Sequence, residues 1–294
     1  MKKLSGVFIC LLLFTFISSA RIIEVADAGI TDKLKAVIVA KNAGGAPAGA
    51  TDYTQDANCM AAWYMNGASG GDGTENETDR CNGGSETLVM KAADSTPDSA
   101  TVPAGYAGSS RDFEMGDYEY MSVADGGTTD ISGADQALSI CVWIKFESDP
   151  GADATFVWKH GTSGNFQYYL RHDHAANAVE FRLSNDGTTE VLCYGTVDMA
   201  DDTDWHHVCG VYNDIDIRLY HNGSLDSNGA NNPKSHTSGI YGGTEPFYIG
   251  ARSGSNNPFD GLIDEIIVLD RALSAEEVLE IYNNGISGNK GGSD

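Results

Sequence analysis

Long hydrophobic runs are almost absent from this sequence of 294 residues. The longest, residues 7–17, is shorter than the roughly 20 apolar residues that a membrane-spanning helix needs. It follows two lysines and precedes Ser18, Ser19 and Ala20, small residues typical of a signal-peptidase cleavage site. The sequence therefore predicts a secretory signal peptide at residues 1–20 and no membrane span.

Basic residues are also scarce. The chain has 18 lysines and arginines against 42 aspartates and glutamates, a formal net charge of −24. Nucleic acids and anionic membrane surfaces are bound by clusters of lysine and arginine, so both classes of partner are excluded. The acidity suits divalent cations, although solubility alone is another explanation of it.

Motifs of covalent and phosphate chemistry are missing as well. No Gly-x-Ser-x-Gly nucleophile motif occurs, and the glycines mark turns rather than a phosphate-binding loop. The nearest match to a glycosidase carboxylate pair is Glu114, Asp117 and Glu119. On a strand Glu114 and Asp117 face opposite sides, whereas retaining hydrolysis needs two carboxyl groups about 5 Å apart. We therefore expect no enzymatic activity.

Cysteines are few and odd in number. Six are present, and five remain after removal of the signal peptide, so at least one is free. Export permits disulfides. We expect the pair Cys59–Cys81, which would close the segment between them, rich in Gly, Asp and Asn. Cys141 and Cys209 fall in strand-like runs and are interpreted as small core residues.

Short apolar runs bounded by Gly, Asn or Asp fill most of the remaining chain and are typical of strands. Residues 138–146 alternate, with five apolar side chains on one face, and indicate a central strand. The organisation that follows is a spacer or arm at 21–51, one domain at 52–286 and a flexible tail at 287–294. Many short strands in one domain predict an all-β sandwich rather than an α/β fold.

Local signals fix two further elements. Residues 205–212 and 215–220 form two strands separated by Asn213 and Asp214, which predict a tight hairpin turn. Ser274 and Glu277 form a capping box, and apolar residues then recur at helical spacing until Asn284 and Gly285. We expect one short C-terminal helix.

Four blocks of sequence resemble a known family: residues 60–67 with 79–83, residues 110–123, residues 205–208 with 219–223, and residues 259–278. Trp205 and His206 begin a Trp-His-x-Val motif, and Asn222-Gly223 ends the strand behind it. Together these blocks resemble the laminin-G-like jelly-roll domain of the concanavalin A-like lectin/glucanase superfamily. The resemblance implies a jelly roll, a two-sheet antiparallel β-sandwich. It says little about the ligand, because such folds host many functions.

Asp264 is the strongest single candidate for a functional side chain. It shares strand parity with apolar Leu262, Ile266 and Val268, so we expect it to point inward or lie at a strand mouth. The family resemblance implies a structural calcium ion at Asp264, completed by Asn66 and Asp79 near the opening strand. Oxygen ligands at loop ends suit calcium. The alternative is a hydrogen-bonded Asp264 without a metal.

Two pairs of histidines are candidates for metal ligands. His206 and His207 are adjacent, so on a strand they face opposite ways and cannot bind the same ion. His172 and His174 are two residues apart and could form a zinc pair, but a third ligand is not visible. We interpret them as part of an exposed turn.

Ligand contacts are expected where aromatic and polar side chains alternate between strands. Aromatic faces stack on sugar rings while Arg and His donate hydrogen bonds. The candidates are Trp158, His160, Tyr168, Tyr169 and Arg171. The alternative is that Trp158 and one of the tyrosines belong to the core.

Three functions follow from these observations. The first is a secreted, non-catalytic carbohydrate-binding or adhesion module, extracellular or at the cell surface, that binds a polysaccharide or a glycoprotein glycan. The second is an extracellular structural protein that self-assembles, with the apolar patch Val37-Ile38-Val39 of the arm adding a strand to a neighbour. The third is a glycoside hydrolase or polysaccharide lyase with unrecognised catalytic residues.

Overall fold

The computed structural model describes residues 50–66, 76–91, 99–161, 164–200, 202–252 and 256–290. The chain divides into two units, Met1–Gly49 and Ala50–Asp294, and all described residues belong to the second. The signal peptide, the arm and its apolar patch lie outside the described residues. No helix of the described part is long and apolar enough to cross a membrane.

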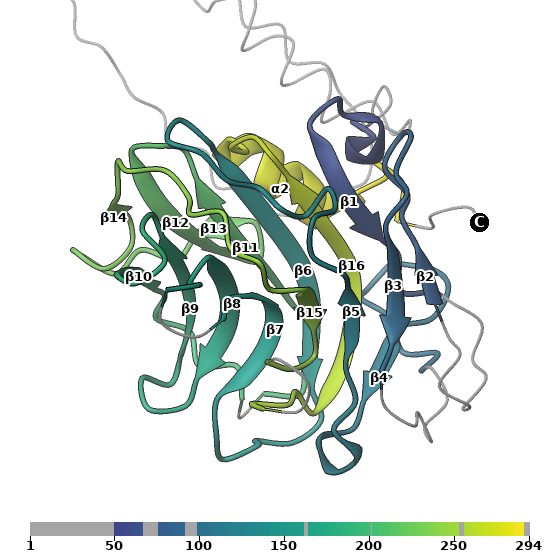
Figure 1. Ribbon diagram of the computed structural model, residues 1–294. Coiled ribbons are helices and arrows are strands. Elements are labelled where there is room, and N and C mark those ends of the chain that lie inside the picture. Colours follow the sequence, from purple (N-terminus) through teal and green to yellow (C-terminus); the bar gives the residue numbers. More distant parts are fainter. Residues whose placement is uncertain are drawn as a thin grey trace, which may run out of the picture. The chain divides into compact units, whose positions relative to one another are not determined.

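Two antiparallel sheets of eight strands each form the sandwich (Figure 1). Sheet A has the order β1-β16-β6-β11-β12-β13, with β4 paired to β16 and β14 paired to β12. Its strands are β1 Cys59–Trp63, β4 Arg111–Phe113, β6 Leu138–Phe146, β11 His206–Tyr212, β12 Asp216–His221, β13 Ser224–Leu225, β14 Lys234–Ser235 and β16 Gly261–Leu269.

Sheet B has the order β10-β9-β8-β7-β15-β5-β3-β2. Its strands are β2 Asn76–Thr78, β3 Thr87–Met90, β5 Met121–Val123, β7 Ala154–Lys159, β8 Tyr168–Asp173, β9 Ala178–Ser184, β10 Glu190–Tyr194 and β15 Phe247–Ile249. Two short 3-10 helices, Tyr53–Gln55 and Met115–Asp117, and the α-helix α2, Ala275–Asn284, complete the described elements. The predicted all-β sandwich with one C-terminal helix is confirmed.

The main core lies between the sheets. The five alternating residues of β6 (Leu138, Ile140, Val142, Ile144 and Phe146) are part of it, and β6 is central in its sheet, as predicted. A second apolar cluster lies on the outer face of sheet A, where Val278 and Ile281 of α2 pack against Ile267 and Leu269 of β16. Sheet A is therefore buried on both faces over much of its area.

Local chemistry explains the turns and the helix. Asn213 accepts hydrogen bonds from the backbone N–H groups of Ile215 and Asp216, which closes the predicted β11–β12 hairpin. The Ser274 hydroxyl accepts from the Glu277 N–H, and the Glu277 carboxylate accepts from the Ser274 N–H, so the capping box is complete. Both predicted elements are confirmed.

Two disulfides are present. Cys59–Cys81 joins β1 to the loop before β3, as expected. Cys141–Cys209 is a second bridge, between directly paired residues of β6 and β11, so the interpretation of these cysteines as unbridged core residues was wrong. Sequence spacing cannot reveal such a pair, because register across a sheet is a non-local property. Cys193 is free and buried.

The first and last parts of the domain lie side by side. β1 pairs with β16, and the Tyr53 N–H donates to the carbonyl oxygen of Ile286. The Tyr53 hydroxyl also donates to Glu280 of α2. These contacts hold the first residues of the domain against its C-terminal helix.

Candidate functional site

The outer face of sheet B carries a row of polar and aromatic side chains in cross-strand register. Arg182, Tyr169, Trp158, Tyr248 and Ser122 occupy successive strands β9, β8, β7, β15 and β5 and are paired one to the next. Side chains at paired positions project from the same face of a sheet. The register therefore builds an aromatic ladder, Tyr169–Trp158–Tyr248, across the middle of this face.

The half of the ladder over β7 and β8 is closed. The rings of Trp158 and Tyr169 stack with centroids 4.2 Å apart, and each side chain is 2% exposed. Guanidinium groups cover the rings: Arg252 lies 4.9 Å from the Trp158 ring, and Arg171 and Arg182 lie 5.3 and 5.4 Å from the Tyr169 ring. Such cation–π contacts hold the aromatic layer beneath a charged one.

Carboxylates balance the arginines of this half. Glu180 is fully buried and forms ion pairs with Arg171 and Arg182, and its carboxylate accepts a hydrogen bond from the Tyr169 hydroxyl. Burial and the Glu180 charge raise the pKa of Tyr169, so its hydroxyl remains a donor. The arrangement is a connected network of ion pairs and hydrogen bonds, which holds the arginines in place.

His160 lies at the edge of the same network. Its ring stacks on Phe166, with centroids 4.3 Å apart, and its Nε2 is 3.0 Å from a carboxylate oxygen of Glu190. Burial opposes ionisation of Glu190, but the hydrogen bond from His160 and the charge of Arg182 lower its pKa overall. Four of the predicted ligand residues, Trp158, His160, Tyr169 and Arg171, are thus brought together.

Tyr168 is separated from that group. It faces the interior between the sheets, is fully buried and donates its hydroxyl hydrogen bond to the carbonyl oxygen of Thr129. Successive strand residues point to opposite faces, so Tyr168 and Tyr169 cannot share one surface.

The other half of the face is open. A groove of about 540 Å³ lies over β3, β5 and β15. Its half-buried rings, Tyr120 and Tyr248, are tilted against each other with centroids 5.9 Å apart. The other lining residues are Glu86, Thr87, Val89, Lys91, Ser122, Val123, Ala124 and Pro246.

Sequence reasoning missed this groove. Tyr120 lay within a block assigned to the family's hairpin, and Tyr248 within a short apolar strand. The available signal was the alternation of Tyr248 against buried Phe247 and Ile249, which marks it as outward-facing. Nothing local, however, places Tyr248 beside Tyr120.

Asp264 lies on the opposite sheet, and its orientation differs from the expected one. A register shift in the β16–β6 pairing follows Asp264, where Glu265 adopts a left-handed backbone conformation (φ 43°). This β-bulge reverses the alternation, so Asp264 pairs with Trp143 and faces the outer side of sheet A, while Ile266 and Val268 face the core. The expected shared parity was therefore wrong beyond Leu262.

Asp264 is nevertheless buried, at 2% exposure. Burial and the neighbouring Glu265 charge raise the pKa of Asp264 well above its ordinary value. One of its oxygens accepts a hydrogen bond from the Glu265 N–H. Trp143, its cross-strand neighbour, stacks on Tyr282 of α2 and donates a hydrogen bond to the Tyr106 hydroxyl.

The two other predicted calcium ligands accept backbone hydrogen bonds. The carboxylate of Asp79 accepts from the N–H groups of Ala62, Cys81 and Glu86, and thereby organises the loop closed by the Cys59–Cys81 disulfide. The side-chain oxygen of Asn66 accepts from the Ser109 N–H.

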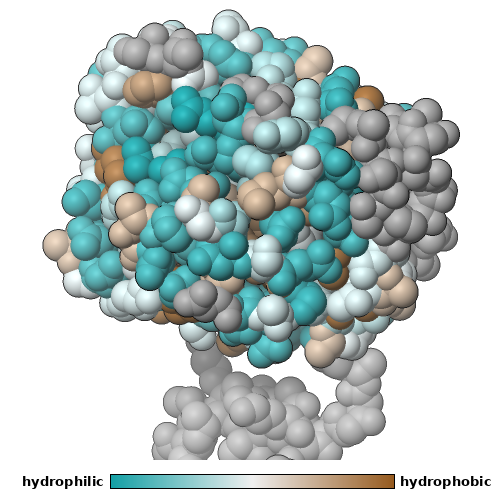
Figure 2. All heavy atoms as spheres, turned by 90° about the horizontal axis from the view of Figure 1, so that it is seen from below, coloured by the Kyte–Doolittle hydropathy of each residue, from teal (hydrophilic) through white to brown (hydrophobic). Residues whose placement is uncertain are grey.

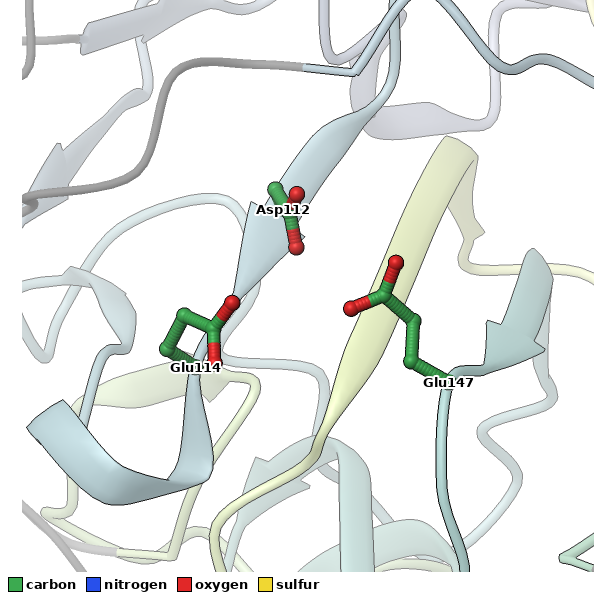
Figure 3. A group of neighbouring side chains, drawn as sticks. All are labelled: Asp112, Glu114 and Glu147. Carbon is green, nitrogen blue, oxygen red and sulfur yellow. The ribbon is translucent and has the colours of Figure 1, made fainter.

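A different set of carboxylates converges on sheet A. Among the described residues, one group of three His, Cys, Asp or Glu side chains brings its ligand atoms within 4.8 Å of one another, namely Asp112, Glu114 and Glu147 (Figure 3). Asp112 is on β4, Glu114 follows it, and Glu147 follows β6. The spacing suits oxygen ligands around one cation, so this triad could hold a metal ion.

The triad is also a centre of negative charge. Burial and the charges of Asp260, Glu147 and Asp117 raise the pKa of Glu114. A cation among these carboxylates would relieve their mutual repulsion. Glu119 belongs elsewhere: it is fully buried and accepts a hydrogen bond from the Glu114 N–H. The acidic run of the sequence therefore does not form one paired site.

The histidine expectations were met in part. His206 and His207 face opposite sides of β11, as predicted. His174 is exposed, but His172 is fully buried with its Nε2 3.3 Å from Asp198, so its interpretation as part of an exposed turn was wrong. The two rings do not converge, because His172 points into the sandwich.

Comparison with known proteins adds three observations. A family model described as the concanavalin A-like lectin/glucanases superfamily matches residues 116–279. Neuronal pentraxin-2 of mouse and of human is 24% identical over 153 residues, which are 50% of this chain and 34% of those proteins. The chain thus matches about a third of the length of these relatives.

Solved structures share the fold at low identity. The binding domain of Paraclostridial Mosquitocidal Protein 1 matches with a TM-score of 0.54 at 14% identity, over 77% of this chain and 52% of that one. The receptor binding domain of botulinum neurotoxin D matches with a TM-score of 0.54 at 12% identity, over 79% and 53%. The jelly-roll order of the two sheets and the extent of the family match lead to one assignment. The chain belongs to the concanavalin A-like lectin/glucanases superfamily.

Proposed function

We propose that this protein is a secreted, non-catalytic carbohydrate-binding module whose glycan lies in the groove of sheet B. The observation that carries the proposal is the open groove lined by Tyr120 and Tyr248 at the end of an aromatic ladder. Half-exposed rings next to polar groups are the usual composition of a sugar site, since sugar rings present apolar faces and hydroxyl edges.

Polar groups surround the two rings. Ser122 is paired with Tyr248 across the sheet and lies two residues from Tyr120, while Thr87 and Lys91 lie on β3 and at its end. Glu86 is already oriented, because its carboxylate accepts hydrogen bonds from the Thr128 N–H and hydroxyl. The groove thus offers stacking surfaces, donors and acceptors within one hollow.

The predicted residues Trp158, His160, Tyr169 and Arg171 extend this surface. Trp158 is the direct cross-strand neighbour of Tyr248, so a chain-like glycan on the groove would run toward it. The guanidinium of Arg252 over the Trp158 ring would then meet the sugar hydroxyls. We propose that this half contributes polar contacts, while the open half supplies the stacking.

The relatives support binding over catalysis. The two toxin structures are named as a binding domain and a receptor binding domain, and the family description names lectins beside glucanases. The converging carboxylates lie on sheet A, whereas the aromatic groove lies on sheet B. A glycan in the groove would therefore be on the far side of the sandwich from this triad.

Secretion is supported by the two disulfides, which form and persist in oxidising compartments. It also agrees with the signal peptide expected at residues 1–20. Self-assembly through residues 21–51 is the alternative, and it predicts particles in light scattering that disappear when those residues are deleted.

The test is binding of the purified domain to a panel of polysaccharides and glycans. We expect saturable binding to one glycan class, at least a tenfold loss in Tyr120→Ala and Tyr248→Ala, and no loss in the control Tyr118→Ala. Tyr118 is a suitable control, because it is 55% exposed and is not among the groove residues. Binding unaffected by both groove variants would refute the site, and release of reducing ends would refute the non-catalytic role.

We further propose that the domain binds a structural calcium ion. The carboxylates of Asp112, Glu114 and Glu147 form one candidate site, and Asp264 with Asn66 and Asp79 forms the other. In either site calcium would neutralise buried or crowded negative charge. An ion that binds the folded state and not the unfolded one stabilises the fold by mass action.

Thermal unfolding in calcium and in chelator tests this proposal. We expect calcium to raise Tm, with the rise lost in Glu147→Gln if the triad binds it and in Asp264→Asn if the other set does. Glu276→Gln in α2 is the control, and it should keep the rise in Tm because Glu276 lies outside both sets. An equal Tm with calcium and with chelator would contradict the calcium proposal.

A further inference from the structure

Two histidines meet at one end of sheet A, and neither belongs to the groove or to the proposed calcium ligands. His206 begins β11 and His221 ends β12, the neighbouring strand. Both project from the same face as Val208 and Leu219, the core face of the sheet. Nδ1 of His206 and Nε2 of His221 form a hydrogen bond 2.9 Å long, and the ring centroids are 5.1 Å apart.

The second ring nitrogen of His206 is the unusual feature. The side chain is 5% exposed, and Nε2 forms no hydrogen bond with any residue that the structure describes. The carboxylate of Asp202 lies beside it, with Oδ2 3.6 Å from that nitrogen. A buried, unpartnered ring nitrogen facing a carboxylate matches the arrangement behind many metal-bound imidazoles, where the second N–H donates to a carboxylate.

We propose that His206 Nδ1 and His221 Nε2 together bind a divalent transition-metal ion of the Zn²⁺ type, with Asp202 orienting the His206 ring. Asp202 favours the tautomer of His206 that carries its proton on Nε2. This tautomer leaves the lone pair of Nδ1 directed at His221. Without a metal, one of these two nitrogens carries the proton of their hydrogen bond. Metal binding selects the tautomer of His221 with its proton on Nδ1, so that both lone pairs face the ion.

The geometry requires little adjustment. With Zn–N bonds of about 2.0–2.1 Å and tetrahedral angles, two ligating nitrogens lie about 3.3 Å apart. The present separation is 2.9 Å, so the rings would need to move apart by about 0.4 Å. His221 is half-buried and the Asp202 side chain is 46% exposed, so the ion can reach the pair from solvent, and water can complete its coordination.

The protonation state is suitable as well. Burial lowers the pKa of His206 and of His221, so both rings are neutral at neutral pH, which is the form that binds metals. The charged groups that act on the pair are three carboxylates and one amine: Asp202, Asp204, Asp226 and Lys145. Imidazole nitrogens favour zinc, copper and nickel over calcium, so this site is independent of the calcium proposal.

The test is titration of the full domain with Zn²⁺ by calorimetry, with Co²⁺ absorption as a report on nitrogen ligands. We expect one Zn²⁺ per domain and at least a tenfold weaker affinity in His221→Gln and in His206→Gln. Asp202→Asn should weaken binding about tenfold through the His206 ring. His174→Gln is the matched control, because His174 is an exposed histidine 3.9 Å from a carboxylate of Asp149.

Each variant is first melted without metal to show that it folds. No Zn²⁺ binding by the wild-type domain, or equal binding by His221→Gln, would overturn the proposal. Loss of binding in Glu147→Gln instead would assign the ion to the acidic triad and overturn it likewise.

Discussion

The two outer faces of the sandwich differ in what covers them. On sheet A, α2 packs Val278 and Ile281 onto the strands, and Tyr282 stacks on Trp143. On sheet B, the aromatic ladder is covered by arginine side chains over one half and is open over the other. One outer face of the fold is thus closed by a helix, whereas the other keeps an open groove. The rings in the open half are only half-buried, so their packing contributes less to stability than that of the helix-covered face.

The largest expected effect concerns the covered face. Ile281→Ala should lower the free energy of unfolding by about 3 kcal/mol, because it removes a fully buried side chain from the α2 interface. Tyr248→Ala, on the open face, should cost less than about 1 kcal/mol, because the ring is half-buried. Urea unfolding of both variants measures the difference. Equal losses would show that the open face is part of the stabilising core.

A smaller effect concerns the charge buried beneath α2. Burial raises the pKa of Glu265 from its ordinary value of 4.5 to about 7, although its carboxylate accepts a hydrogen bond from the Ile286 N–H. The folded pKa of Glu265 is above the unfolded one. The contribution of Glu265 to the free energy of unfolding is therefore fully present below about pH 4.5 and is lost as the pH rises toward 7. Glu265→Gln should remove that loss, so its advantage over wild type should grow between these pH values.

The pKa of Glu280, also on the covered face, is shifted in the opposite direction, so its effect on stability has the opposite pH dependence. The hydrogen bond from the Thr51 N–H, helped by the Tyr53 hydroxyl, lowers its pKa against the opposing effect of burial. Its contribution is therefore present above the unfolded pKa and is lost as the pH falls. Chemical unfolding of Glu280→Gln across acidic pH should show a deficit that shrinks at low pH. A deficit independent of pH would contradict this account.

Features decided by neighbouring residues were predictable from the sequence. The capping box at Ser274 and Glu277, the turn at Asn213 and the alternation of β6 each depend on a few consecutive residues. The family motifs then supplied the sandwich. In such patterns, the residues that cause the structure are close together in the sequence, so the structure can be predicted from them.

Features decided by register were not predictable. The bulge at Glu265 changed the side on which Asp264 lies, and the pairing of β6 with β11 joined Cys141 to Cys209. The groove depends on the pairing of β5 with β15, which brings Tyr120 beside Tyr248. A register shift of one residue moves every side chain of a strand to the other face of the sheet. The sequence alone therefore does not determine which side chains share a face.

The adjacency of Tyr53 and Ile286 has a practical consequence for protein engineering. Because the chain enters and leaves the folded domain at neighbouring points, the whole domain can be grafted into a surface loop of a host protein. The host loop would not be distorted, because the two points at which the domain is attached to it lie close together. The face of sheet B that we propose to bind glycans would then be displayed on the surface of the host protein.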